Sequence, residues 1–336
     1  MSSYGVISSI SIPILISIIL KSIITYIIGL CIIIINILLI ASLTRIKRLR
    51  TTQNLLLINV CCACIYFSLS CIVSVSLTMC ILNTKNINSY LCQFIGFLVI
   101  SSTHSVMLSY TLVTFIRFLT IIYPFNRKIT KIHYIKNCLI SKWILAIFLP
   151  GISLILPNQQ IIFQSKAKIC TINQQSPLLF IYFCTGYIIP FVLISLMNLV
   201  TYLNVTYSRQ IPFLSRMKQC RLNRRKRRNL RLLRQFSFFT IIFLLGWTPF
   251  IIIEIFDKEG KLPDIFYLFT LILPLICILI DSTAILYWNK TIHHQIQLWR
   301  QSLIKKRPQI INHERNNYTT NHDSFSIDRN ANMSSV

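Results

Sequence analysis

Three ionisable side chains stand in or beside long apolar stretches of this sequence. His104 lies inside the apolar run that Cys92 opens and Arg117 closes, and Asp281 interrupts a second run near the C-terminus. A charge in an apolar environment is costly unless it is hydrogen-bonded, so such side chains usually bond a neighbour or serve a function. Arg117 alone could also be an anchor that reaches to a membrane surface.

No arrangement of residues typical of an enzyme is present. The sequence contains no HExxH, Walker or GxSxG motif and no zinc-binding spacing, and its eight acids and six histidines are widely scattered. We therefore predict that the protein is not an enzyme and that it binds no metal or cofactor.

The composition is that of a chain that crosses a membrane several times. Hydrophobic residues make up 54% of the 336 and charged residues only 12%, whereas soluble domains carry about 25% charged residues. Seven apolar stretches are each long enough to span a bilayer as a helix. They comprise residues 21–43, 54–82, 92–122, 137–156, 178–207, 232–256 and 265–288. We predict an all-α membrane protein with a seven-transmembrane-helix bundle over residues 21–288.

The net charge of +26 is distributed unevenly about these spans. All but six of the 34 Lys and Arg residues fall on one side of the predicted membrane, as the positive-inside rule requires of the cytoplasmic side. A basic face of this kind can meet anionic lipid of the inner leaflet. We therefore expect no nucleic-acid partner, and we expect an extracellular N-terminus over residues 1–20.

The predicted outer loop between the fourth and fifth spans has a partly alternating pattern. Its centre, residues 161–172, alternates apolar and polar side chains and contains Cys170. Such a pattern allows a short hairpin pinned by Cys170.

Several landmarks occur in a fixed order along the spans. The third span begins with Cys92 and ends with Arg117, and residues 243–250 read Phe-Leu-Leu-Gly-Trp-Thr-Pro-Phe. The first, fourth and fifth spans contain Asn36, Trp143 and Pro190. Over most of its length, this order resembles that of the rhodopsin-like (class A) G-protein-coupled receptors, of which the chain would be a divergent member.

The resemblance implies a disulfide and a switch at opposite ends of the third span. In this family an outer cysteine is bonded to the second outer loop, which here implies a bond between Cys92 and Cys170. Both cysteines stand at the predicted outer face, which is an oxidising compartment. At the inner end, Ile116, Arg117 and Phe118 stand where the family has Asp-Arg-Tyr, and this implies contact with a heterotrimeric G protein.

A second switch is implied in the sixth and seventh spans. Phe243, Trp247 and Pro249 match the family's Phe-x-x-Cys-Trp-x-Pro, and Asp281 stands at the first position of its Asn-Pro-x-x-Tyr. Pro249 removes a backbone donor and lets the helix kink. A ligand that presses on Trp247 would shift the sixth span and open an inner cleft at Arg117. The alternative is a kinked helix with a large aromatic side chain in its core.

Four positions depart from the family pattern. Cys64 replaces the aspartate that binds sodium, and the other changed switch positions are Ile116, Ser282 and Ile285. A thiol cannot supply the hard oxygen that a sodium ion requires. A receptor-like protein that has lost G-protein coupling is therefore one alternative. A polytopic transporter or channel is another, although the sequence lacks inverted repeats with broken half helices.

The ligand class follows from the outer half of the spans. Val99 stands where amine receptors of the family carry an aspartate, so an extracellular peptide, such as a neuropeptide, is favoured over an amine. Glu254 and Asp257 would line the mouth of a ligand site, and His104 is a further candidate. The alternative is that the acids form a solvated loop.

The remaining predictions concern the C-terminus and the location. Residues 289–303 resemble the amphipathic helix that lies on the inner leaflet in this family, and the polar tail of residues 304–336 is expected to be disordered. We expect a multi-pass protein of the plasma membrane with its N-terminus outside.

Overall fold

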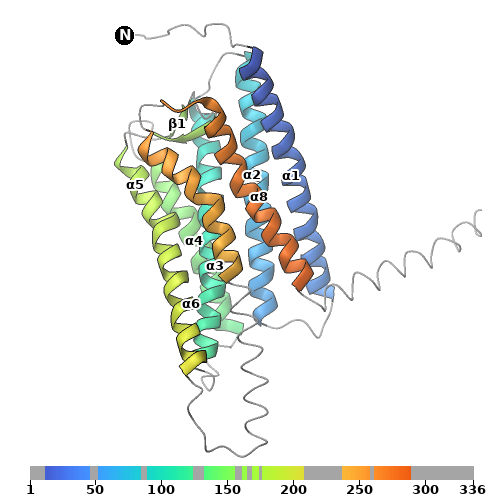
Figure 1. Cartoon of the computed structure of the whole chain (residues 1–336), viewed down its shortest axis with the longest axis vertical. Coiled ribbons are helices and arrows are strands. Elements are labelled where there is room, and N and C mark those ends of the chain that lie inside the picture. The colour runs from blue at the N-terminus through green and yellow to red at the C-terminus, as the bar shows by residue number, and fades with distance from the viewer. Residues whose placement is uncertain are drawn as a thin grey trace, which may run out of the picture. The chain divides into compact units, whose positions relative to one another are not determined.

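The computed structural model describes the spans and the outer hairpin of the chain. The described residues are 12–45, 52–84, 89–123, 132–155, 161–164, 169–173, 176–207, 237–257 and 261–288. Seven helices among them are long and apolar enough to cross a membrane, which confirms the predicted seven-helix fold (Figure 1). By its internal contacts the chain divides into Met1–Ala284 and Ile285–Val336. All the contacts described below belong to the first unit.

The first four spans are uninterrupted helices, as a membrane requires of a backbone that must satisfy its own hydrogen bonds. They are α1 (Ile12–Arg45), α2 (Thr52–Thr84), α3 (Ser89–Ile122) and α4 (Ile132–Ile155). The helix α1 begins earlier than the span expected from residue 21. Pro13 suits the first turn of a helix, and no glycine or proline follows it before Gly29.

The last three spans include one composite helix. The fifth comprises α5 (Pro177–Phe183), a π-helix (Cys184–Ile188) and α6 (Ile189–Tyr207). The sixth is the helix Ser237–Phe256, and the seventh is α8 (Asp264–Trp288).

Pro190 provides a physical reason for the π-helix. A proline ring inside a helix clashes with the carbonyl four residues earlier, which here belongs to Gly186. A wider turn relieves this clash, and the N–H of Ile189 bonds to the carbonyl oxygen of Cys184, five residues back. Insertions of this type occur frequently at functional sites.

The helix α3 is the central element of the first unit. It contacts α2, α4, α6 and both strands of the hairpin (Figure 1). Many of its buried side chains are small, and small residues let neighbouring helices approach closely. These residues are Gly96, Ser101, Ser102, Ser105 and Ser109. The hydroxyl groups of Ser101, Ser102 and Ser109 donate to carbonyl oxygens of their own helix, at 2.7 to 3.2 Å.

The predicted hairpin is present, at the end of the bundle where α3 begins. Strands β1 (Ile161–Gln164) and β2 (Ile169–Ile172) pair antiparallel, with Phe163 opposite Cys170. A disulfide between Cys92 and Cys170, with their Cα atoms 5.4 Å apart, joins β2 to the first turn of α3. Ile161 packs over Gly96, where a Cβ atom would also lie only 3.1 Å from the carbonyl oxygen of Cys170. The glycine therefore allows the hairpin to lie against α3.

Some predicted segments lie outside the described residues. These are the amphipathic helix of residues 289–303 and the tail of residues 304–336.

Candidate functional site

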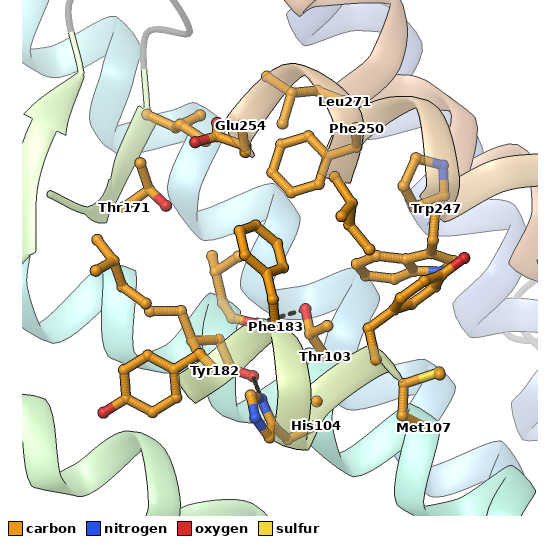
Figure 2. A pocket seen from close by; sticks show the side chains of 18 of the residues that line it. Thr103, His104, Met107, Thr171, Tyr182, Phe183, Trp247, Phe250, Glu254 and Leu271 are labelled. Atoms are coloured by element: carbon orange, nitrogen blue, oxygen red, sulfur yellow. Dashed lines mark hydrogen bonds between the residues drawn. The ribbon is translucent and has the colours of Figure 1, made fainter. Parts of the chain in front are cut away.

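An apolar cavity of about 140 Å³ lies beneath the hairpin. Residues of α2, α3, β2, α5, the π-helix, the helix Ser237–Phe256 and α8 line it (Figure 2). Trp247 and Met107 lie on one side of the view, and Thr171 and Tyr182 lie on the other. Val99 belongs to the wall, so the position of the amine receptors' aspartate is apolar here.

Among the described residues that line the cavity, the acidic one is Glu254. Its side chain is only 1% exposed, and it lies near Thr171 and Phe250 in Figure 2. The glutamate is on the sixth span, two helical turns beyond Trp247 along the chain. A buried carboxylate in an apolar cavity is suited to bind a cationic group.

Asp257 does not line the cavity and instead organises the turn between the sixth and seventh spans. Its carboxylate accepts hydrogen bonds from the backbone N–H groups of Lys261 at 2.7 Å and Leu262 at 2.9 Å. The hydroxyl group of Tyr267 also donates to this carboxylate. The structure thus separates the two acids that the sequence had placed together at the mouth.

His104 lies in the wall of the cavity and is 2% exposed. Its Nδ1 is 2.9 Å from the carbonyl oxygen of Ile100, and its ring meets the edge of Tyr182 at 5.9 Å between centroids. The ring packs against Gly186 of the π-helix, where a Cβ atom would come within 2.7 Å of Nε2. The imidazole is therefore held by α3 and the fifth span together.

A stack of aromatic rings leads from the cavity towards the inner half of the bundle. Trp247 and Phe243 are stacked with centroids 5.4 Å apart and an interplanar angle of 14°. Phe243 in turn contacts Tyr110 at 6.3 Å and Tyr187 at 6.1 Å. The pairs of Phe243 with Trp247 and Tyr187 are stacked, and its pair with Tyr110 is edge-to-face. Both arrangements at such distances stabilise the rings beyond their burial alone.

The stack ends at the buried acid of α8. The hydroxyl group of Tyr110 donates to Oδ2 of Asp281 at 3.2 Å. Asp281 is 1% exposed, and Oδ1 has no hydrogen-bond partner among the described residues. The structure therefore links two predicted switch residues, Trp247 and Asp281, through Phe243 and Tyr110. No role for Tyr110 was predicted from the sequence.

Pro249 lies within the sixth span, two residues after Trp247. It leaves the carbonyl of Leu245 without its usual helical donor. Next to it, the hydroxyl groups of Thr248 and Tyr187 are 2.7 Å apart. This contact ties the proline segment to the π-helix of the fifth span.

At the inner end of α3, the three residues of the predicted G-protein switch differ in burial. Ile116 is 4% exposed and belongs to the same apolar core as Ile135 of α4. Arg117 and Phe118 are partly exposed, and Nη1 of Arg117 is buried. The residue that replaces the family's acid thus points into the core.

A polar network between α2, α3 and α4 was not predicted from the sequence. Nζ of Lys142 donates to Oγ of Ser105 at 2.8 Å and lies 3.6 Å from the ring centroid of Trp143. Nε1 of Trp143 donates to Oδ1 of Asn59 at 2.9 Å, and Nδ2 of Asn59 donates to Oγ of Ser109 at 3.1 Å. Lys142 is only 6% exposed, so these bonds hold a basic side chain inside the bundle.

A further link joins the first and seventh spans. Nδ2 of Asn36 donates to Oγ of Ser282 at 3.0 Å and to the carbonyl oxygen of Ile32 at 2.8 Å. Ser282, one of the positions that depart from the family pattern, therefore still takes part in interhelical bonding.

No metal centre is formed by the described side chains, since none of the groups of His, Cys, Asp and Glu among them could hold an ion.

These features define the class of protein: a polytopic membrane protein with seven helices that can span a membrane and an apolar cavity under a disulfide-bonded hairpin. Residues 35–288 match the family model described as 7 transmembrane receptor (rhodopsin family), and the chain belongs to this family. It is a family of receptors rather than of enzymes, and its members in general bind an extracellular ligand and a G protein. No curated protein matches the chain.

Proposed function

We propose that this receptor lies in the plasma membrane and binds an extracellular peptide in the cavity beneath the hairpin. Binding there activates a heterotrimeric G protein at Arg117. The observation that carries the proposal is the aromatic stack, which runs from Trp247 in the cavity wall through Phe243 to Tyr110, the partner of Asp281.

Through the aromatic stack, a ligand in the cavity can change the side-chain packing in the inner half of the bundle. Trp247 packs against Phe67 at 5.5 Å as well as against Phe243, so a ligand that displaces the indole must also move its neighbours. Packed cores rearrange between discrete states rather than deform smoothly. A ligand shifts such an equilibrium only by its difference in affinity for the two states. Contact with Trp247 supplies that difference.

A peptide is favoured over an amine because of the charges of the cavity. Val99 is apolar, whereas Glu254 places a carboxylate in the lining from the sixth span. The cationic group of the ligand would therefore bind on the hairpin side of the cavity, where a longer ligand can also contact β2. This is our reason for proposing a basic or amino-terminal group of a peptide as the bound cation.

A second-messenger assay without added ligand tests coupling. Cells that express the receptor should give a signal above that of cells without it, and Arg117→Ala at equal surface expression should abolish the excess. A silent wild-type receptor at the cell surface would instead favour the alternative of a receptor-like protein without coupling. Its departures at Cys64, Ser282 and Ile285 would then account for the loss.

Topology is tested separately with tags. We propose that the N-terminus is outside and that the basic loops face the anionic inner leaflet. A tag before Met1 should be labelled on intact cells, and a tag after Ser335 only after permeabilisation. Labelling of both tags on intact cells would contradict the seven-span orientation.

A further inference from the structure

Trp247 and Glu254 present two different chemistries to the cavity from one helix. They are seven residues apart on the sixth span, and both line the cavity. Seven residues correspond to nearly two full turns, so the side chains share a face and are separated by about 10 Å along the helix. A ligand that contacts both must therefore combine an apolar group and a charged group in a fixed order.

The cavity as a whole is large enough for a single aromatic ring. Its volume is about 140 Å³, and an apolar protein cavity of about 150 Å³ is large enough to hold benzene. Phe67 and Met107 complete the lining around Trp247, and aromatic rings pack on one another with centroids about 4.5–7 Å apart. An aromatic ring placed on Trp247 leaves only about 5 Å to a cation at Glu254. Ring and charge must therefore be close neighbours in the ligand.

The α3 wall of the cavity includes two polar side chains that contact their own helix. Oγ1 of Thr103 donates to the carbonyl oxygen of Val99 at 2.9 Å, and Nδ1 of His104 lies 2.9 Å from the carbonyl oxygen of Ile100. Glu254, on the sixth span, contributes the acidic side chain of the described lining. A carboxylate attracts a cationic group, so we expect the charged group of a ligand to be a cation.

The strand β2 borders the cavity with its backbone. All four of its residues, Ile169 to Ile172, line the cavity, although successive side chains of a strand point to opposite faces. The strand must therefore present an edge to the cavity, and among the described residues it pairs only with β1. An extended peptide can bind such an edge through its main chain.

We propose that the ligand is a peptide whose first residue is aromatic. Its ring occupies the cavity on Trp247, its free α-ammonium group pairs with Glu254, and the following residues run out along β2. In such a residue the ring and the ammonium group are attached to neighbouring carbons. This matches the short distance between a ring placed on Trp247 and a cation at Glu254. This inference rests on the proposed function in one respect, namely that the cavity is the ligand site.

The test uses the full-length receptor in lipid nanodiscs and defined probes at millimolar concentration. The readout is the rise in melting temperature, because a ligand that binds only the folded state stabilises it by RT ln(1 + [L]/Kd), so that tighter binding at a fixed concentration gives a larger rise. The probes are phenylalanyl-alanyl-alanine amide, its N-acetylated form, lysyl-alanyl-alanine amide and phenethylamine. We expect the free phenylalanyl peptide to give the largest rise, and acetylation to weaken its binding about tenfold or more.

Two carboxylate variants separate the roles of the acids. Glu254→Gln should remove the difference between the free and acetylated peptides, whereas Asp257→Asn should keep it, because Asp257 bonds the turn rather than the cavity. Glu254→Asp retains the charge and should keep the preference with lower affinity. A cooperative melting transition of Glu254→Gln without ligand shows that a loss of preference in this variant is not due to misfolding.

Several results would overturn the proposal. Equal shifts with the free and acetylated peptides would rule out a contact between the α-ammonium group and Glu254. A larger shift with the lysyl peptide would show that Glu254 binds a basic side chain of the ligand instead. Phenethylamine acting as well as the peptide would exclude the contact along β2 and favour a free amine. No shift with any probe would exclude this occupant of the cavity. None of these binding results depends on ligand-independent coupling through Arg117, which is tested by the second-messenger assay.

Discussion

The hydroxyl group of Tyr110 donates a hydrogen bond to Oδ2 of Asp281, 3.2 Å away, and thereby joins α3 to α8 inside the bundle. Tyr110→Phe keeps the ring in its stack but removes the donor. A buried acceptor that loses its partner costs about 1–3 kcal/mol, so we expect the variant to melt at a lower temperature. The measurement is thermal unfolding of the purified receptor in nanodiscs.

Asp281→Asn is the matched control for this bond. The amide oxygen can still accept from Tyr110, so this variant should lose less stability than Tyr110→Phe. The double variant should lose less than the sum of the two single effects, because both changes act on one contact. Strict additivity would show that Tyr110 and Asp281 act independently.

The disulfide between Cys92 and Cys170 gives a second prediction. It closes a loop with a sequence separation of 78, and a chain-entropy model assigns about 3–5 kcal/mol to a loop of that size. Cys92→Ala and Cys170→Ala should lower surface expression equally, and the double variant should lower it no further. Cys31→Ala, at an exposed free cysteine, should leave expression unchanged. Additive losses would mean that the two cysteines act separately.

Gly186 and His104 form a third testable pair. An added Cβ at Gly186 would meet the imidazole at 2.7 Å, and overpacking of this kind typically costs about 1–3 kcal/mol. Gly186→Ala should therefore lower the melting temperature, and His104→Ala in the same chain should restore part of the loss. At Gly151 the nearest atom, in Phe97, would be 4.0 Å away, so Gly151→Ala should be tolerated. Equal losses at both glycines would contradict the packing described.

Lys142 provides a fourth prediction, because its amino group is buried against Ser105 and Trp143. Burying a charged or polar group costs free energy that an apolar residue of similar size avoids. Lys142→Met should therefore be neutral or stabilising in thermal unfolding. Ser105→Ala should instead destabilise the receptor by about 1–3 kcal/mol, since it removes the acceptor of the amino group. A severe loss in Lys142→Met would indicate that the charge itself is required.

The spans could be predicted from local composition, and the disulfide could be predicted from the resemblance to the family together with the positions of its two cysteines. A helix in a membrane needs only a sufficiently long apolar stretch, and Cys92 and Cys170 stand out as cysteines at the outer face. The π-helix is different. Its position depends on how Pro190 and Gly186 pack together, which no hydropathy average records.

The side-chain partners could not be predicted, because an almost wholly apolar helix gives no indication of which face it buries. From the sequence, Lys142 resembles the other basic residues near the inner side. In the structure its amino group donates to Ser105 inside the bundle. Asp257 and Glu254 read alike as acids at a helix end. Only the structure separates the turn-forming carboxylate from the one in the cavity. The burial of Lys142 could have been predicted from one signal, because this lysine interrupts an apolar stretch next to Trp143.

We propose that Arg117 is a coupling switch. In related receptors the acid before this arginine pairs with it and helps to hold the inactive state, and Arg117 lacks that restraint. Ile116, at the position of that acid, cannot accept a hydrogen bond, and a partly exposed charge pair there would contribute about 1 kcal/mol to the inactive state. Its absence should raise a small active fraction about fivefold. Because Ile116 lies in the apolar core, Ile116→Asn serves as the control for introducing a polar group at this position.

The most direct measurement is ligand-independent second-messenger output at matched surface expression for wild type, Ile116→Asp, Ile116→Asn and Arg117→Ala. We predict measurable output from the wild type, a reduction in Ile116→Asp that exceeds any reduction in Ile116→Asn, and none from Arg117→Ala. An absence of basal output, with no difference between the Asp and Asn variants, would contradict the account and leave Arg117 as a structural anchor.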